Sequence, residues 1–352
     1  MIRQLTYAQS VNEAIDLSMA KDKTVYMMGL GVPDPKGVFG TTLGLQEKYG
    51  DSRVMDMPIA ENGMTGIAVG SALAGMRPIL VHQRVDFAVL AMEQMANQAA
   101  NWHYMFGGKK SVPMVVRVMV GRGWGQGPQH SQSLQSWFAH VPGLKVVMPA
   151  TPYDAKGLLI SSIEDNNPVV FLEHRWLHGV SDNVPEGLYN VPLGKAKILR
   201  EGKDVTIVAA SYMVLEANRA AQFLAAHGVD VEVIDLRTIK PLDTATVLAS
   251  VRKTGRLIAA DTGWKTCGVA GEIVALASEE AFSSLKCAPM RVTLPDCPTP
   301  TTPVLANLYY PGTATLVDAA VRMLGLNPKI TEEAEGKYKV LDVPDTSFKG
   351  PF

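Results

Sequence analysis

The feature that most constrains the fold is a regular alternation, in the second half of the chain, of short apolar runs and helical segments. The apolar runs have strand length, and the segments between them carry apolar residues at helical spacing and end near a glycine. Strands joined in this way by short links are parallel and connected by right-handed crossovers. The pattern therefore predicts a sheet covered by helices. In chain order the segments are strand 205–209, helix 213–226, strand 229–236, helix 244–253 and strand 257–260.

The first half of the chain shows the same two periodicities. Thr6 is expected to cap a first helix, and Thr151, followed by Pro152 and Asp154, is a strong start for another. A helix is also predicted over 86–102. Strands are predicted at 24–28, 77–81, 112–120 and 169–172. The fold class predicted from both halves is α/β, with two doubly wound domains.

Weakly periodic segments mark the expected domain boundaries. Residues 181–200 are rich in glycine, proline, aspartate and asparagine, which is typical of a linker, and the chain after about residue 327 is polar and contains several prolines. The expected organisation is a first domain over 1–180, a linker over 181–200, a second domain over 201–326 and a C-terminal arm over 327–352.

Composition excludes several classes of function. The 33 basic and 34 acidic side chains are nearly balanced, so the chain has no basic field for a nucleic acid or an anionic membrane. No window contains about 18 uninterrupted apolar residues, and the first twenty positions lack the order of a signal peptide. The three cysteines indicate a reducing compartment rather than a disulfide framework. We therefore expect a cytoplasmic protein.

The usual short motifs of catalysis are missing or incomplete. Gly29-Leu30-Gly31 follows an apolar run, but Asp34 stands where a dinucleotide-binding loop needs its third glycine. The Gly-x-x-x-x-Gly-Lys, Gly-x-Ser-x-Gly and His-Glu-x-x-His patterns do not occur. A nicotinamide enzyme, a serine hydrolase and a zinc protease of these types are therefore not indicated.

Glu61 and His130 are the residues whose positions suggest chemistry. Glu61 precedes an apolar helix that has to be buried, so it is either an acid that complements the helix dipole or a desolvated carboxylate that holds a proton or a heterocycle. His130 lies in a glycine-rich loop, residues 121–134, that follows a buried strand. A lone histidine is commonly structural, but for a histidine in such a loop a structural role and a role in the active site are equally plausible interpretations.

Several longer motifs follow one another along the chain. They are Pro-Ile-Ala-Glu-Asn-Gly at 58–63, His-Gln-Arg-Val-Asp-Phe at 82–87, Gln-His-Ser-Gln-Ser at 129–133, and Val-Ile-Asp-Leu-Arg-Thr-Ile-Lys-Pro-Leu-Asp at 233–243. In this order they resemble one family, the β subunit of the thiamine-diphosphate-dependent E1 component of 2-oxo acid dehydrogenase complexes. This family includes pyruvate, branched-chain 2-oxo acid and acetoin dehydrogenases and is transketolase-like. The resemblance runs from about residue 4 to 325.

The resemblance implies roles for individual residues. It implies a pyrimidine-binding N-terminal domain and a transketolase-C-like C-terminal domain. The glutamate that matches Glu61 hydrogen-bonds the cofactor's aminopyrimidine N1′ and so promotes loss of the thiazolium proton. Phe87 matches the aromatic that packs on the pyrimidine, and Ile59 and Gln83 line the same pocket. His130 matches the histidine that orients the substrate or relays a proton near the lipoyl acceptor.

A structural potassium site is a further implication of the resemblance. Such an ion would be held by carbonyls and side chains around five positions. An ordinary helix end with an Asx turn explains the same residues. The positions are Met114, Ser162, Ile163, Asp165 and Asn167.

The family's diphosphate-binding signature, Gly-Asp-Gly followed by Asn-Asn, is incomplete, since Gly50-Asp51 is followed by Ser52. The resemblance then implies an α subunit that carries Mg²⁺ and the diphosphate half of the site, in an α2β2 heterotetramer that shares the thiamine diphosphate. It also implies a small 2-oxo acid or acetoin as substrate and a lipoyl-bearing E2 acyltransferase that receives the acyl unit. Two alternatives are the small subunit of a split transketolase and a non-catalytic assembly paralogue.

Overall fold

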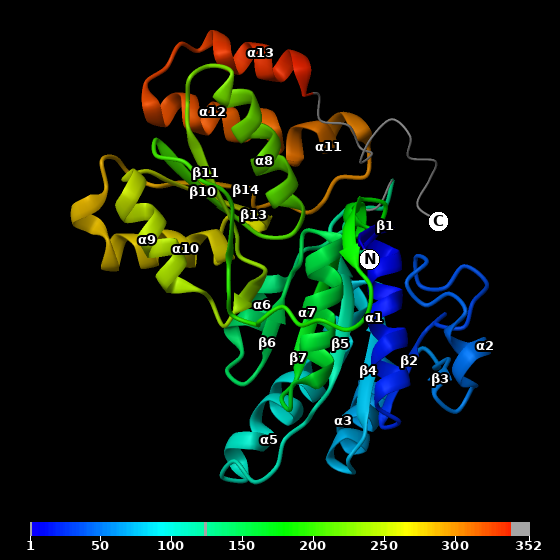
Figure 1. The fold of residues 1–352 in the computed structure, drawn as a ribbon. Helices are drawn as coiled ribbons and strands as arrows, with labels where there is room; N and C mark the ends of the chain where they lie inside the picture. The colour runs from blue at the N-terminus through cyan, green and yellow to red at the C-terminus, as the bar shows by residue number, and fades with distance from the viewer. Residues whose placement is uncertain (1, 123–124, 339–352) are drawn as a thin grey trace. The chain divides into compact units, whose positions relative to one another are not determined.

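The computed structural model describes residues 2–122 and 125–338, and these residues form two compact units (Figure 1). The first unit comprises residues 2–122 and 130–193, and the second comprises 125–129 and 194–338. Each unit has a largely parallel sheet with helices, which confirms the predicted two-domain α/β fold class.

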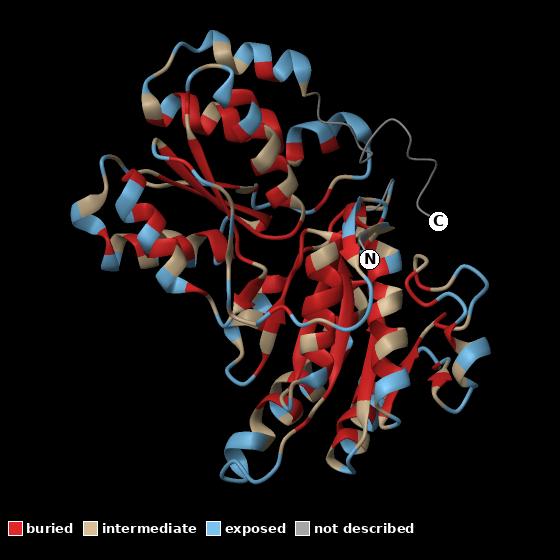
Figure 2. Ribbon diagram, viewed as in Figure 1, coloured by how far each residue is buried: buried red, intermediate tan, exposed pale blue. Residues whose placement is uncertain are grey.

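The sheet of the first unit has its strands in the order β6-β7-β5-β4-β2-β3, and every neighbouring pair is parallel. These strands are buried along most of their length (Figure 2), as expected for a parallel sheet with covered faces. A separate antiparallel pair joins β1 to β8. The strands are β1 (Ile2–Thr6), β2 (Val25–Gly29), β3 (Val54–Met55), β4 (Arg77–His82), β5 (Val115–Val120), β6 (Lys145–Val147), β7 (Val169–His174) and β8 (Ser181–Pro185).

Helices follow most of these strands. Two of them begin as the sequence predicts. Thr6 and Gln9 form a capping box at the start of α1, and the Thr151 hydroxyl accepts the Asp154 N–H at the start of α7 (3.1 Å). The helices are α1 (Tyr7–Lys21), α2 (Leu45–Tyr49), α3 (Glu61–Leu73), α4 (Val85–Ala88), α5 (Ala100–Met105), α6 (Gln135–His140) and α7 (Pro152–Glu164), with 3₁₀ turns η1 (Val89–Ala91) and η3 (Arg175–Leu177) and a π-helix η2 (Gln94–Ala99).

The helix predicted over 86–102 is present as a helical stretch but is not uniform. It changes from α (α4) through 3₁₀ (η1) and π (η2) and returns to α in α5. Periodicity alone does not distinguish these hydrogen-bond patterns, because a π turn inserts a residue without ending the helix.

The second unit has its sheet in the order β14-β13-β10-β11-β9. The three predicted strands are parallel, as expected, and a fourth, β14, pairs parallel with β13, whereas β9 is antiparallel to β11. The strands are β9 (Lys197–Arg200), β10 (Val205–Ala209), β11 (Val231–Asp235), β12 (Thr238–Lys240), β13 (Leu257–Trp264) and β14 (Met290–Leu294). The helices are α8 (Tyr212–Ala225), α9 (Thr244–Thr254), α10 (Val269–Glu280), α11 (Pro303–Tyr309), α12 (Thr313–Leu324) and α13 (Lys329–Lys337), with a 3₁₀ turn η4 (Phe282–Ser284).

The segments between and after the domains contain regular structure. The segment expected as a linker, 181–200, contains β8 and β9. The expected C-terminal arm contains α13, and its residues 339–352 lie outside the described part of the chain. Among the helices of the described residues, none combines the length and hydrophobicity that a membrane crossing requires.

Candidate active site

The candidate site lies at the carboxyl ends of β3, β2 and β4, where the segments that follow the three strands are hydrogen-bonded to one another. The Gly31 N–H donates to Asp56 Oδ1 (2.9 Å), and Gln83 Nε2 donates to the Leu30 carbonyl (2.9 Å). Gly31 has φ +71°, and a Cβ there would lie 2.7 Å from Gln83 Nε2. Glycine at 31 is therefore required for the close approach that holds the Gln83 amide. Open parallel sheets bind ligands at this edge.

Glu61 is the first residue of α3, at the end of the segment that follows β3. The residue is only 6% exposed, yet among the described residues no group donates a hydrogen bond to its carboxylate. Nearby Ile59 is 79% exposed. Most of the residue is thus buried while its carboxylate has no protein donor, and such a carboxylate can accept a hydrogen bond from a ligand N–H or N–H⁺.

A buried histidine, His82, is linked through Thr65 to the first turn of α3. Thr65 Oγ1 donates to the Glu61 carbonyl (2.7 Å), and the same hydroxyl lies 3.4 Å from His82 Nε2 at the end of β4. Because the Thr65 proton is used, the hydroxyl accepts from His82, which requires the Nε2–H tautomer. Burial lowers the pKa of His82 to about 4, so its ring is neutral at physiological pH.

Phe87 and His130 are brought together by the fold. Their rings are edge to face, with centroids 5.3 Å apart. Phe87 belongs to α4, whereas His130 belongs to the glycine-rich loop, which contains no helix or strand over its described residues 121–122 and 125–134. Phe87 follows β4 and His130 follows β5. The two predicted site residues thus meet at the same edge of the sheet.

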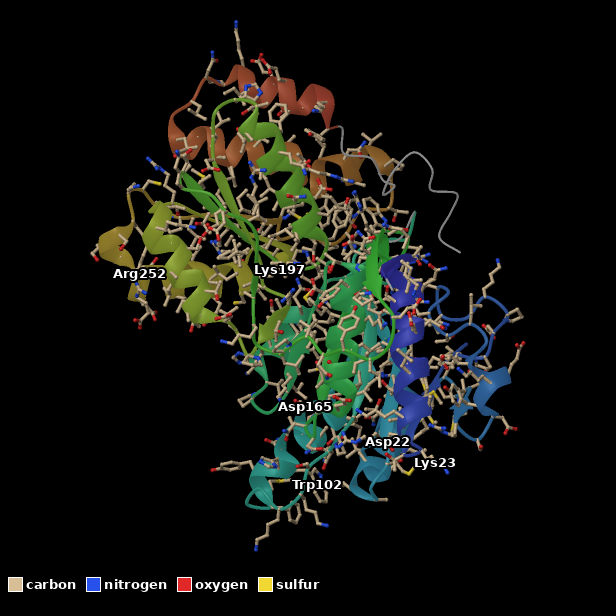
Figure 3. All side chains as sticks on the ribbon, viewed as in Figure 1. Asp22, Lys23, Trp102, Asp165, Lys197 and Arg252 are labelled. Atoms are coloured by element: carbon tan, nitrogen blue, oxygen red, sulfur yellow. The ribbon has the colours of Figure 1, made fainter. Side chains whose placement is uncertain are left out.

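The five residues of the expected potassium site lie around the carboxyl end of α7, but some of their oxygens already have partners. Arg77 Nη1 donates to the carbonyls of Ile163 (3.0 Å) and Asp165 (2.9 Å). Asp165, labelled in Figure 3, accepts the Asn167 N–H through Oδ1 (2.8 Å).

The other two positions of the expected potassium site are also hydrogen-bonded. The Met114 carbonyl accepts the Val169 N–H, and the Ser162 hydroxyl donates to the Leu158 carbonyl. Potassium binding here stays a prediction.

Fully buried charges connect two adjacent strands, β5 and β7. Arg117 donates to both oxygens of Glu173 (2.7 and 2.9 Å), and His178 Nε2 lies 3.3 Å from the same carboxylate. Burial acts to raise the pKa of Glu173, but the Arg117 charge and the hydrogen bonds from His178 and Arg117 lower it. This carboxylate is thus charged and fully paired, in contrast to Glu61.

No three His, Cys, Asp or Glu side chains gather to hold a metal ion anywhere in the residues that the structure describes. Two residues of the site received no role from the sequence alone, namely Asp86 and Gln132, which are hydrogen-bonded to each other (2.9 Å). Both stand inside motifs quoted for the family resemblance, next to Phe87 and near His130. Their proximity to predicted site residues was the available signal.

Comparison with known proteins identifies the family. The model of the transketolase pyrimidine-binding domain matches residues 3–179, and that of the transketolase C-terminal domain matches residues 194–316. The β subunit of acetoin:2,6-dichlorophenolindophenol oxidoreductase from Cupriavidus necator is 46% identical, over 91% of this chain and 97% of the relative. The chain belongs to the E1 β-subunit family.

Other E1 β subunits are similar over comparable lengths. The mitochondrial pyruvate dehydrogenase E1 component subunit beta-1 of Arabidopsis thaliana is 44% identical, over 91% of this chain and 89% of the relative. A solved chain described as a split-gene transketolase in an inactive β4 tetramer superposes with a TM-score of 0.74 at 22% identity, covering 92% and 99% of the two chains. That likeness shows the transketolase-like fold of this E1 β-family member.

Proposed function

We propose that this chain is the β subunit of a heteromeric, thiamine-diphosphate-dependent E1 enzyme that acts on a 2-oxo acid or on acetoin. The observation that carries the proposal is Glu61, a nearly buried carboxylate without a described protein donor at the start of α3. The identity to β subunits of acetoin and pyruvate dehydrogenases supports it. When bound, thiamine diphosphate supplies the nucleophilic carbon and the electron sink for cleavage next to a carbonyl.

Glu61 holds and moves a proton in this proposal. Its carboxylate would accept a hydrogen bond from a ring nitrogen of the aminopyrimidine and would thereby favour the protonated form of that ring. No described side chain competes for the carboxylate, so it is free to accept a ligand donor, and closure of the site around a ligand would strengthen this interaction. Thr65 and His82 fix the turn that carries Glu61.

The remaining site residues bind and orient. Phe87 offers an aromatic surface for the heterocycle, and Ile59 and Gln83 line the same pocket, with the Gln83 amide held on the Leu30 carbonyl. His130, packed edge to face on Phe87, orients the substrate or relays a proton. An α subunit brings Mg²⁺ and the diphosphate-binding half in an α2β2 assembly, and a lipoyl group on an E2 acyltransferase accepts the acyl unit.

The proposal is tested with the chain purified alone and with an α partner that carries Gly-Asp-Gly. Cofactor binding is measured by calorimetry, and turnover by dye reduction with acetoin, pyruvate and branched 2-oxo acids. Glu61→Gln keeps the shape of the side chain but removes the proton acceptor. We expect the Glu61→Gln complex to lose about 10²- to 10⁴-fold in kcat, the range typical of general acid–base catalysis.

Glu201→Gln is the matched control, because Glu201 is an exposed carboxylate of the second unit that accepts from Lys253 (2.7 Å). This variant should keep wild-type turnover. Full activity of the Glu61→Gln complex would contradict the role of Glu61, and turnover by the chain alone would contradict the shared site. Transfer to a sugar phosphate without dye reduction would point instead to a ketol transferase.

A further inference from the structure

We propose that Asp86 and Gln132 form a clamp that sets the position of His130 against Phe87, and that they act as positioning residues rather than catalytic ones. The inference rests on the proposed function for the role of His130. The clamp itself is defined by three residues, Asp86, Gln132 and Gly121.

The hydrogen bonds of Gln132 close the glycine-rich loop at its base. The Gln132 carbonyl accepts the Gly121 N–H (3.1 Å), which joins the end of β5 to the far side of the loop. Asp86 Oδ1 accepts from Gln132 through both the side-chain Nε2 (2.9 Å) and the backbone N–H (3.4 Å). One glutamine thus fastens the loop to its own strand and to α4.

Gly121 allows this closure. Its φ of +83° is a left-handed conformation, and a Cβ at this position would lie 2.2 Å from His174 Nε2. No other residue fits here without moving the buried His174 ring. The base of the loop is therefore fixed by backbone geometry as well as by hydrogen bonds.

The clamp lies directly beside the predicted site residues in the sequence. Asp86 precedes Phe87, and Gln132 follows His130 by two residues. The two contacts between α4 and the loop, the Asp86–Gln132 hydrogen bonds and the Phe87–His130 ring contact, are therefore adjacent. With the first contact in place, the His130 backbone has little freedom to move away from Phe87.

The chemistry favours a carboxylate at position 86. Two N–H groups that converge on a single oxygen bind a charged acceptor more strongly than a neutral one. The other oxygen, Oδ2, is buried and accepts no hydrogen bond from a described residue, while the Arg84 charge lies close enough to interact with Asp86. The carboxylate is thus held in one orientation with Oδ1 toward the loop.

The first test follows His130 without any cofactor or substrate. The full chain is treated with diethyl pyrocarbonate, and the rate of modification at His130 is measured by mass spectrometry. A loop released at its base opens more often and exposes His130 more often. Asp86→Ala and Gln132→Ala should therefore each raise this modification rate about tenfold. The double variant should differ little from either single variant, as expected for two residues of one interaction. Asp86→Asn retains an acceptor oxygen but loses the charge, so its rate should lie between those of Asp86→Ala and the wild type.

The second test uses the assembled complex. Displacing His130 by about 1 Å should lower kcat by about 10- to 100-fold in Asp86→Ala and Gln132→Ala, with partial recovery in Asp86→Asn. Glu201→Ala, which removes an exposed carboxylate–lysine hydrogen bond (2.7 Å), is the matched control and should alter neither readout. Circular dichroism confirms that each variant is folded.

The outcomes separate this inference from the proposed function. An unchanged His130 modification rate in both folded alanine variants would overturn the clamp, whatever the activity. If the wild-type complex reduces no dye with any of the substrates, the proposed function fails, while the modification rates still decide whether the clamp exists.

Discussion

At the scale of single residues, His82 links stability to the candidate site. Its ring is buried beneath the first turn of α3 and hydrogen-bonds Thr65, so protonation would place an unpaired charge in the interior. Burial lowers its pKa from 6.5 to about 4. The folded chain therefore binds fewer protons than the unfolded chain between these two pH values.

This difference predicts how stability depends on pH. The contribution of His82 is complete above pH 6.5 and is lost as the pH falls toward 4, by on the order of 3 kcal/mol in total. His82→Gln should flatten the dependence of the free energy of unfolding on pH in that interval, as measured by urea denaturation at a series of pH values. His103→Gln alters an exposed imidazole and should keep the wild-type slope. Equal slopes in the His82 variant and the wild type would refute the link.

The residues of the site could be predicted from the sequence to different degrees. The sequence placed Glu61 at the start of a buried helix and His130 in an irregular loop, because those features depend on local periodicity and glycine content. The Asp86–Gln132 pairing joins residues 46 positions apart, and the Arg77 contacts with Ile163 and Asp165 span 86 and 88 positions. No local pattern encodes such distances.

At the scale of secondary-structure elements, β5 and β7 are joined by more than their backbone ladder. The Arg117–Glu173 ion pair is fully buried between them. The parallel strands themselves were predicted from apolar runs, but Arg117, inside one run, and Glu173, just after the other, carried no signal of their pairing. The antiparallel β9 was likewise missed, since residues 197–200 show little hydrophobic alternation.

Breaking this pair should be strongly destabilising. Glu173→Gln leaves a buried guanidinium without its counter-charge and should lower the free energy of unfolding by about 3–5 kcal/mol. Replacing both partners, with Arg117→Met and Glu173→Leu, should recover most of that loss. Glu164→Gln removes a solvent-exposed ion pair with Lys21 and should cost less than about 1 kcal/mol. Urea denaturation of the four proteins gives the comparison, and similar losses for Glu164→Gln and Glu173→Gln would refute the argument.

At the scale of the whole molecule, the first unit exposes large apolar side chains between residues 59 and 106. Tyr104 is 89% exposed, and Leu90 and Ile67 are each more than half exposed. Isolated exposed apolar residues are ordinary, but a concentration within one such short stretch of the chain is typical of a subunit that is covered by a partner. This agrees with the proposed heteromeric assembly.

Charged substitutions test the assembly. Ile67→Glu and Tyr104→Glu should each weaken association with the α partner at least about tenfold, since a buried unpaired carboxylate costs several kcal/mol at an interface. Leu188→Glu changes another exposed apolar residue, outside residues 59–106, and should leave association unchanged. Sedimentation velocity of the mixed subunits measures the effect. Normal assembly of both substituted chains would argue against a partner surface in this region.

The pairing of β1 with β8 has a practical consequence for dissecting the chain. Ile2 is paired with Pro185 and Thr6 with Ser181, so the first strand is completed by residues that lie beyond β7 (Figure 1). A fragment that stops at residue 180 would leave β1 as an unpaired edge, open to association with other chains. Any expression fragment designed to carry the first unit must therefore extend past Pro185.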